Sequence, residues 1–132
     1  MSNSSVPAKG IVEECQKRGY LAKQLYMVST RPVNGIGPVM ENLGVHLAFQ
    51  EELEKTGVMF AAGPNWTDDE QDWEGDGTVV YRAASLAEAK AIAARDPMHA
   101  SGARTFTVRP WLINEGTITL EIGFATGRFR LV

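Results

Sequence analysis

Histidine is the side chain best suited to move a proton near neutral pH, and this chain has only two, His46 and His99. His46 lies in the stretch 39–53, whose apolar residues recur at helical spacing. Helical geometry places it on one face with Leu43, Gln50 and Leu53. That face should point inward, so His46 is either a satisfied core residue or a proton-transfer group.

Other residue types capable of chemistry are less informative by themselves. Asp96 precedes Pro97 at the end of a predicted helix, where aspartate commonly caps or turns the backbone. His99 follows in a predicted loop and is expected to be exposed to solvent. Arg31 and Arg109 could bind an anionic substrate, although a surface arginine is more often an ion-pair partner. The lone cysteine, Cys15, has no identifiable neighbouring base, so we do not predict a nucleophile there.

Length and composition restrict the class of protein. The chain has 132 residues, 44% of them hydrophobic and 22% charged, which suits one globular domain. Its formal net charge is −3 and no basic face is evident, so nucleic acid is not an expected partner. No stretch approaches the roughly 18 apolar residues that span a bilayer, so a membrane is not expected either.

The numbers of cysteines and histidines bear on the cellular compartment and on metal binding. A single cysteine cannot form an intrachain disulfide, which fits a reducing cytoplasm, and the first residues contain no apolar signal segment. One cysteine and two widely separated histidines do not make a zinc pattern. We therefore expect a cytoplasmic protein with no metal site. We also expect no cofactor.

The pattern along the chain predicts alternating strands and helices. Strands are expected over 24–30, 58–62, 78–83, 104–111 and 117–124, and helices over 39–56 and 86–95. Ser85 and Glu88 have the spacing of a capping box at the start of the second helix. The acidic segment 65–77 contains Trp66 and Trp73 and is either a solvated loop that packs its indoles on the body or a lid over a pocket.

This order of elements predicts the fold class. Strand, helix, strand, strand, helix, strand is the split β-α-β order of a ferredoxin-like α+β sandwich. We expect an N-terminal arm over 1–23, partly disordered or a short helix, an α+β domain over 24–112 and a C-terminal β extension over 113–132. The 58–62 strand should be buried and the 117–124 strand half-buried. Because the helices cover one face of such a sheet, a second copy of the chain is the expected cover for the other.

Five segments in this order resemble the YCII-related (YciI-like) family. They are Gly-Val-His46-Leu-Ala-Phe-Gln-Glu-Glu-Leu, Gly57-Val-Met-Phe-Ala-Ala-Gly63-Pro64, Ala-Ser-Leu-Ala-Glu-Ala-Lys90, Arg-Asp96-Pro97-Met-His-Ala-Ser-Gly102 and Val108-Arg-Pro-Trp111. No segment is specific alone, but the ordered set over about 24–112 is. The resemblance implies a dimeric α+β barrel, an architecture that the family shares with muconolactone isomerases and small monooxygenases.

The resemblance also implies a site. Family members carry a helix histidine and the aspartate of the Asp-Pro motif as a proposed catalytic pair, and one branch eliminates HCl from a chlorinated hydroxyhydroquinone. The matching residues here are His46 and Asp96, with Gly63 and Pro64 shaping the pocket. A carboxylate beside an imidazole fixes its tautomer, so that the opposite ring nitrogen can act as general base. Tyr26 and Arg31 are further candidates to contact substrate, although Tyr26, like Trp111, is most simply a core aromatic residue.

Three functions follow as hypotheses. The first is a cofactor-free lyase or isomerase acting on a small cyclic or phenolic substrate, with His46 as base and Asp96 orienting it. The second is a non-catalytic protein that binds a small ligand or serves as an accessory, in which the pocket is closed or the pair is split. The third, a cofactor-free monooxygenase, needs a substrate that itself activates oxygen.

Overall fold

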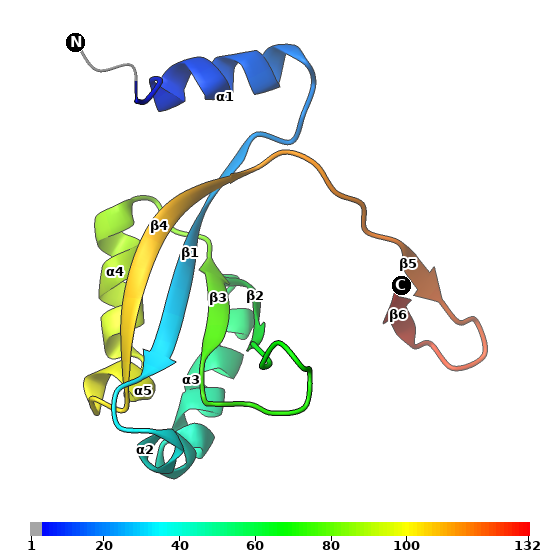
Figure 1. Cartoon of the computed structure of the whole chain (residues 1–132). Coiled ribbons are helices and arrows are strands. Elements are labelled where there is room, and N and C mark those ends of the chain that lie inside the picture. Colours follow the sequence, from blue (N-terminus) through cyan, green and yellow to red (C-terminus); the bar gives the residue numbers. More distant parts are fainter. Residues whose placement is uncertain (1–3) are drawn as a thin grey trace. The chain divides into compact units, whose positions relative to one another are not determined.

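Four strands form the main sheet of the protein. The structure is a computed structural model, and it describes residues 4–132 of the chain. Strands β1 (Lys23–Pro32), β2 (Met59–Pro64), β3 (Gly77–Tyr81) and β4 (Arg104–Ile113) lie in the order β2-β3-β1-β4 (Figure 1). β3 pairs antiparallel with both β1 and β2, and Tyr26 lies opposite Tyr81 in the register. The fold is therefore mixed α+β with an antiparallel sheet.

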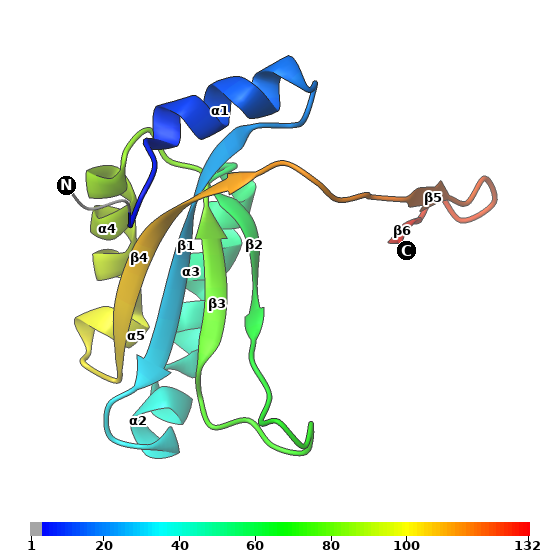
Figure 2. The same cartoon turned by 45° about the horizontal axis from the view of Figure 1, so that its top comes forward.

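The helices that connect the strands of this sheet lie on one of its faces. α3 (Leu43–Lys55) and α4 (Leu86–Arg95) pack behind the strands in both views (Figures 1 and 2). Two short helices, α2 (Ile36–Glu41) and α5 (Pro97–Ala100), precede α3 and follow α4 in the chain. The main core lies between α3, α4 and the sheet, and its fully buried members include Val28, Tyr81, Ala89 and Ala93.

The second long helix begins and ends where the sequence predicts. The Ser85 hydroxyl accepts a hydrogen bond from the Glu88 N–H at 3.1 Å, and the Glu88 carboxylate accepts one from the Ala84 N–H at 3.1 Å. The first contact is the Ser85 half of a capping box, whereas in the second Glu88 bonds the N–H one residue before the N-cap. The helix ends at Arg95 because Asp96, which precedes a proline, takes an extended conformation with ψ 126°.

The first helical stretch differs from the prediction. One helix was expected over 39–56, but α2 and α3 are separate and meet at Asn42, whose φ is −100° and ψ 2°. The Pro38 carbonyl accepts from both the side chain and the backbone N–H of Asn42, at 2.8 and 3.2 Å, so the side-chain contact adds to the backbone bond where the two helices meet. The inward face predicted for α3 is present, since His46 and Leu53 are buried there and Val45 and Leu47 are exposed.

Two strands are less buried than predicted. β2 was expected to be a buried strand, but Phe60 to Pro64 are all exposed, because β2 is an edge strand of the sheet. The strand predicted over 117–124 is only three residues long, and it is exposed rather than half-buried. Alternation of apolar and polar residues predicts a strand with one apolar side, but it does not determine whether another part of the protein packs against that side.

The chain divides into two compact units, one of residues Gln24–Leu112 and one of Met1–Lys23 with Ile113–Val132. In the second unit α1 (Ala8–Lys17) carries the buried Cys15, and β5 (Leu120–Ile122) and β6 (Phe129–Leu131) form an antiparallel hairpin. Residues 1–3 of the predicted arm lie outside the described residues. Within residues 4–132 no helix is long and apolar enough to cross a membrane.

Candidate functional site

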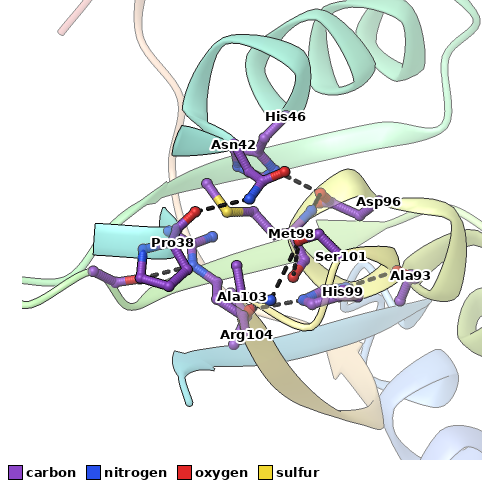
Figure 3. Close-up of polar contacts among 12 residues, drawn as sticks. Pro38, Asn42, His46, Ala93, Asp96, Met98, His99, Ser101, Ala103 and Arg104 are labelled. Atoms are coloured by element: carbon purple, nitrogen blue, oxygen red, sulfur yellow. Dashed lines mark hydrogen bonds and ion pairs between the residues drawn. The ribbon is translucent and has the colours of Figure 1, made fainter. Parts of the chain in front are cut away.

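The structure brings His46 and Asp96 into direct contact. His46 Nδ1 lies 2.8 Å from Asp96 Oδ1, although one residue comes from α3 and the other from the junction of α4 and α5 (Figure 3). Both side chains are nearly inaccessible, with His46 5% and Asp96 1% exposed. Such a pair is held in a poorly hydrated environment, where a charge-assisted hydrogen bond is strong.

Asp96 performs two structural tasks with one oxygen atom. Its Oδ1 accepts the contact from His46 and also a hydrogen bond from the Met98 N–H at 2.9 Å, which caps the start of α5. The backbone of Asp96 leaves the helix because Pro97 follows it, and this turn directs the carboxylate toward α3. The capping role and the contact with the imidazole are therefore both present.

The hydrogen bond assigns the tautomer of His46. An ionised carboxylate only accepts hydrogen bonds, so the ring proton is assigned to Nδ1. The lone pair of a neutral ring then lies on Nε2, which has no hydrogen-bond partner among residues 4–132. Because Asp96 stabilises the imidazolium that forms on protonation, His46 Nε2 is placed to act as a general base.

His46 borders a cavity of about 260 Å³. α3 contributes one side of the cavity, the end of β2 a second side, and β1, β3, β4 and the segment between β2 and β3 the remainder. The lining residues are Thr30, Leu43, His46, Leu47, Gln50, Gly63, Pro64, Trp66, Trp73, Asp76, Gly77, Val79 and Arg104. Engineered apolar cavities of about 150 Å³ hold benzene, so this space fits one ring with a few substituents.

The other predicted site residues lie in different places. Gly63 and Pro64 line the cavity at the end of β2. Tyr26 is 7% exposed and belongs to the main core cluster, and it is not among the lining residues. Arg31 is exposed and borders a second hollow, which shares Trp66 and Asp76 with the first cavity. Arg109 is exposed on β4.

The two tryptophans of the acidic segment differ in exposure. Trp73 is half-buried against the Val39–Met98–Ala103 cluster, and its indole N–H donates to the Asp76 carbonyl at 2.7 Å. Trp66 is 61% exposed, yet it borders the cavity as well. One indole therefore packs on the body of the unit, and both contribute to the wall of the cavity.

Arg104 and Thr30 are lining residues that sequence reasoning missed. Arg104 is 6% and Thr30 2% exposed, and each is a polar residue on the inner face of a strand. Alternation could have found Arg104, because residues 104, 106 and 108 share one face of a strand and the latter two are Phe106 and Val108. An arginine in phase with apolar residues is a signal of an inward-pointing charge.

His99 does not have the exposed position that we predicted. It lies in α5, where its Nδ1 is 2.6 Å from the Ala93 carbonyl and its Nε2 is 2.7 Å from the Thr30 hydroxyl. A carbonyl only accepts, so the proton is assigned to Nδ1, and Nε2 of the neutral ring accepts from Thr30. Burial lowers the pKa of His99 despite the opposing effects of the Ala93 carbonyl and Asp96. His99 was missed because a four-residue helix is too short to show a periodic pattern.

The depressed pKa of His99 predicts that the protein loses stability in mild acid. The unfolded chain binds this proton at about the ordinary pKa of 6.5, whereas the folded chain binds it only at lower pH. Stability from neutral His99 is therefore full above pH 6.5 and declines as pH falls through the folded-state pKa. Urea unfolding across this range should show a steeper loss for the wild type than for His99→Gln, and equal slopes would contradict the prediction.

No group of three histidine, cysteine, aspartate or glutamate side chains that could hold a metal ion occurs within the described part of the chain. The arrangement at the cavity instead combines a buried imidazole–carboxylate pair, a buried guanidinium and two indoles. An imidazole–carboxylate pair beside a cavity can transfer protons to and from a bound molecule.

Comparison with known proteins shows to which family the chain belongs. Among solved structures, the chain is similar to 5-chloro-2-hydroxyhydroquinone dehydrochlorinase (TftG) from Burkholderia phenoliruptrix AC1100, in complex with 2,5-dihydroxybenzoquinone. The TM-score is 0.53 and the identity 22%, and the match covers 66% of this chain and 92% of that one. This likeness shows a shared fold. A search of curated proteins found no match. The model of the YCII-related domain matches residues 25–112, and the chain belongs to that family.

Proposed function

We propose that this protein is a cofactor-independent enzyme of the lyase or isomerase type that acts on a small cyclic or phenolic substrate. His46 Nε2 is the general base, and Asp96 orients the ring and stabilises its protonated form. The observation that carries the proposal is the 2.8 Å contact between His46 Nδ1 and Asp96 Oδ1, made by a ring that borders a cavity.

The proposed reactions are those that a single general base can perform on a ligand bound in the cavity. Removal of a proton from the carbon next to a carbonyl, or from a phenol hydroxyl, leaves an enolate or phenolate and an imidazolium. If the imidazolium returns the proton to another position, the product is an isomer. If the anion instead expels a leaving group, the reaction is an elimination. Positioned acid–base groups contribute about 10²–10⁴-fold to such reactions.

The structural neighbour supports the substrate class. TftG is described as a dehydrochlorinase of a hydroxyhydroquinone, and its structure holds a dihydroxybenzoquinone. The cavity here has a volume suited to one substituted ring, and most of its wall is apolar or aromatic, with Leu43, Leu47, Pro64, Trp66 and Trp73. Such walls bind rings, while a few polar groups orient them.

We also propose that the working form is a homodimer of ferredoxin-like units. α3 and α4 cover only one face of the sheet, and within residues 24–112 no element covers the other face (Figure 2). A sheet normally buries both faces or leaves one polar, and a second copy is the simplest cover. Sedimentation equilibrium should give twice the mass of 14.4 kDa, and a monomer at micromolar concentration would contradict this proposal.

The alternative is a protein that binds a ligand without transforming it. That function is favoured by a closed pocket or by a histidine hydrogen-bonded only to backbone. His46 instead contacts a carboxylate and borders an open space. A cytoplasmic location stays a prediction from the single cysteine.

A ligand-stabilisation screen tests the function. Small phenols, lactones, carboxylates and 2,5-dihydroxybenzoquinone are added to wild type, to His46→Ala and to Val45→Ala, which changes an exposed residue of the same helix. A ligand at a hundred times its Kd should stabilise the fold by about 2.7 kcal/mol. We expect hits with wild type and Val45→Ala, and loss of turnover of any hit in His46→Ala. A hit whose binding and turnover both survive His46→Ala unchanged would falsify the proposal.

A further inference from the structure

We propose that Arg104 binds an anionic group of the ligand, a carboxylate or an ionised phenol or enol, in the cavity that His46 borders. The inference rests on the proposed function in one respect, since it takes this cavity to be the ligand site. It adds the charge of the substrate and names the side chain that recognises it.

The first observation is that Arg104 is a buried charge with no ion-pair partner within 4 Å among residues 4–132. Its exposed fraction is 6%, and it takes part in none of the ion pairs found among residues 4–132. Proteins seldom bury an arginine unless it is paired, because desolvation of the ion is costly. Burial lowers the pKa of Arg104, and its attraction to Asp96 and to Asp76, which also lines the cavity, opposes that effect.

The second observation is that the guanidinium makes a single hydrogen bond within the described residues. Its Nε–H donates to the Gly75 carbonyl at 2.7 Å, and its central carbon lies 5.9 Å from the centre of the Trp73 ring. The guanidinium has five N–H groups in a rigid fork, and this contact uses one of them. Within the described chain the four N–H groups of Nη1 and Nη2 have no hydrogen-bond partner.

The third observation is that this side chain lines the same cavity as His46. The carboxylate nearest to the imidazole, Asp96, is already engaged by His46 and by the Met98 N–H. The cavity therefore combines an unpaired cation with a base whose own counter-charge is occupied. An anion bound to Arg104 would satisfy the fork in the two-pronged geometry that arginine provides for carboxylates.

The arrangement also fits the proposed chemistry. When His46 removes a proton, negative charge develops on the oxygen atoms of the substrate. A fixed cation beside the developing charge stabilises it more in a dry site than in water. Arg104 thus holds the ligand and favours the enolate or phenolate form. Arg31, the arginine favoured by sequence reasoning, is exposed at the second hollow.

A matched pair of probes tests the inference directly. Benzoate and benzamide have nearly the same shape but differ in charge, and their affinities are measured by calorimetry or by ligand NMR. Wild type should bind benzoate roughly tenfold to a hundredfold more tightly than benzamide, the range expected for hydrogen bonds to an ion. Arg104→Gln should lose this preference and keep its affinity for benzamide. Arg31→Gln, the control, should keep the preference.

A second variant guards against a folding defect. Arg104→Lys retains the charge but lacks the planar fork, so a reduced preference for benzoate is expected. Benzoate should also shift the side-chain ¹⁵N resonances of Arg104 in wild type, whereas benzamide should not. Equal binding of the two probes by wild type, a preference that survives Arg104→Gln, or one that disappears in Arg31→Gln would overturn the inference and leave the cavity as the ligand site. If neither probe binds, the ligand site itself is wrong.

Discussion

Asp96→Asn is expected to lower kcat by about two to four orders of magnitude while the protein stays folded. Asparagine can still accept the hydrogen bond from the Met98 N–H that caps α5. The same oxygen also accepts from His46 Nδ1, so asparagine can keep this contact and the tautomer as well. Its side chain is neutral, however, so it no longer stabilises the imidazolium that forms when Nε2 takes a proton. Steady-state kinetics on a hit of the ligand screen measures the loss.

Asp96→Ala provides the matched control for this variant. Alanine removes the cap of α5 and leaves the buried N–H of His46 unpaired, so stability should fall by about 2–4 kcal/mol. Asp96→Asn should lose far less. The ¹⁵N shifts of the His46 ring report the tautomer, and with only two histidines the signals can be assigned by comparison with His99→Gln. Asp96→Asn should keep the ring proton on Nδ1. Full activity of Asp96→Asn would contradict the role given to Asp96.

Local signals in the sequence predicted several parts of the fold well. The Ser85–Glu88 spacing and the Asp96–Pro97 pair determine the two ends of α4, and both act through contacts within a few residues. Periodicity placed His46 on the inner face of α3 for the same reason, because the helix itself sets the direction of a side chain. Features that depend only on residues close together in the sequence could therefore be predicted from the sequence.

Features that depend on distant residues were harder to predict. The burial of β2 depends on its place at the edge of the sheet, and strand order is set by pairing between segments far apart. The surroundings of His99 depend on Thr30 and Ala93, one of them 69 positions away. The contact between His46 and Asp96 was reached through the resemblance to the family, because no local pattern joins residues 50 positions apart.

Arg104 shows how both kinds of information combine. The sequence itself shows that Arg104 alternates in step with Phe106 and Val108, and this pattern predicts that all three lie on the inner face of β4. Its partner, the Gly75 carbonyl, comes from the segment between β2 and β3 and lies 29 positions away. The sequence could therefore reveal the direction of this charge, but only the tertiary structure shows that Arg104 has no ion-pair partner within 4 Å among residues 4–132 and that it borders a cavity.

Gly75→Ala is expected to be strongly destabilising and to weaken ligand binding as well. Gly75 has φ +99°, a conformation that side chains other than glycine rarely adopt. A Cβ atom there would lie 2.9 Å from Pro32 Cγ, 3.0 Å from Ile36 Cδ1 and 3.3 Å from Val39 Cγ2. Backbone strain of about 1–2 kcal/mol and overpacking of about 1–3 kcal/mol should add to roughly 2–5 kcal/mol. Urea denaturation measures this loss.

Gly57→Ala separates the two causes. Gly57 also has a positive φ, +81°, but a Cβ atom there would meet nothing within 4 Å, so only the backbone strain applies. The excess loss in Gly75→Ala is then the cost of the clash. Because the Gly75 carbonyl accepts the Nε–H of Arg104, a shift of this backbone should also lower the affinity for benzoate, whereas Gly57→Ala should leave it unchanged. Equal stability of the two variants would show that the segment around Gly75 yields easily, and that it does not hold Arg104 in place.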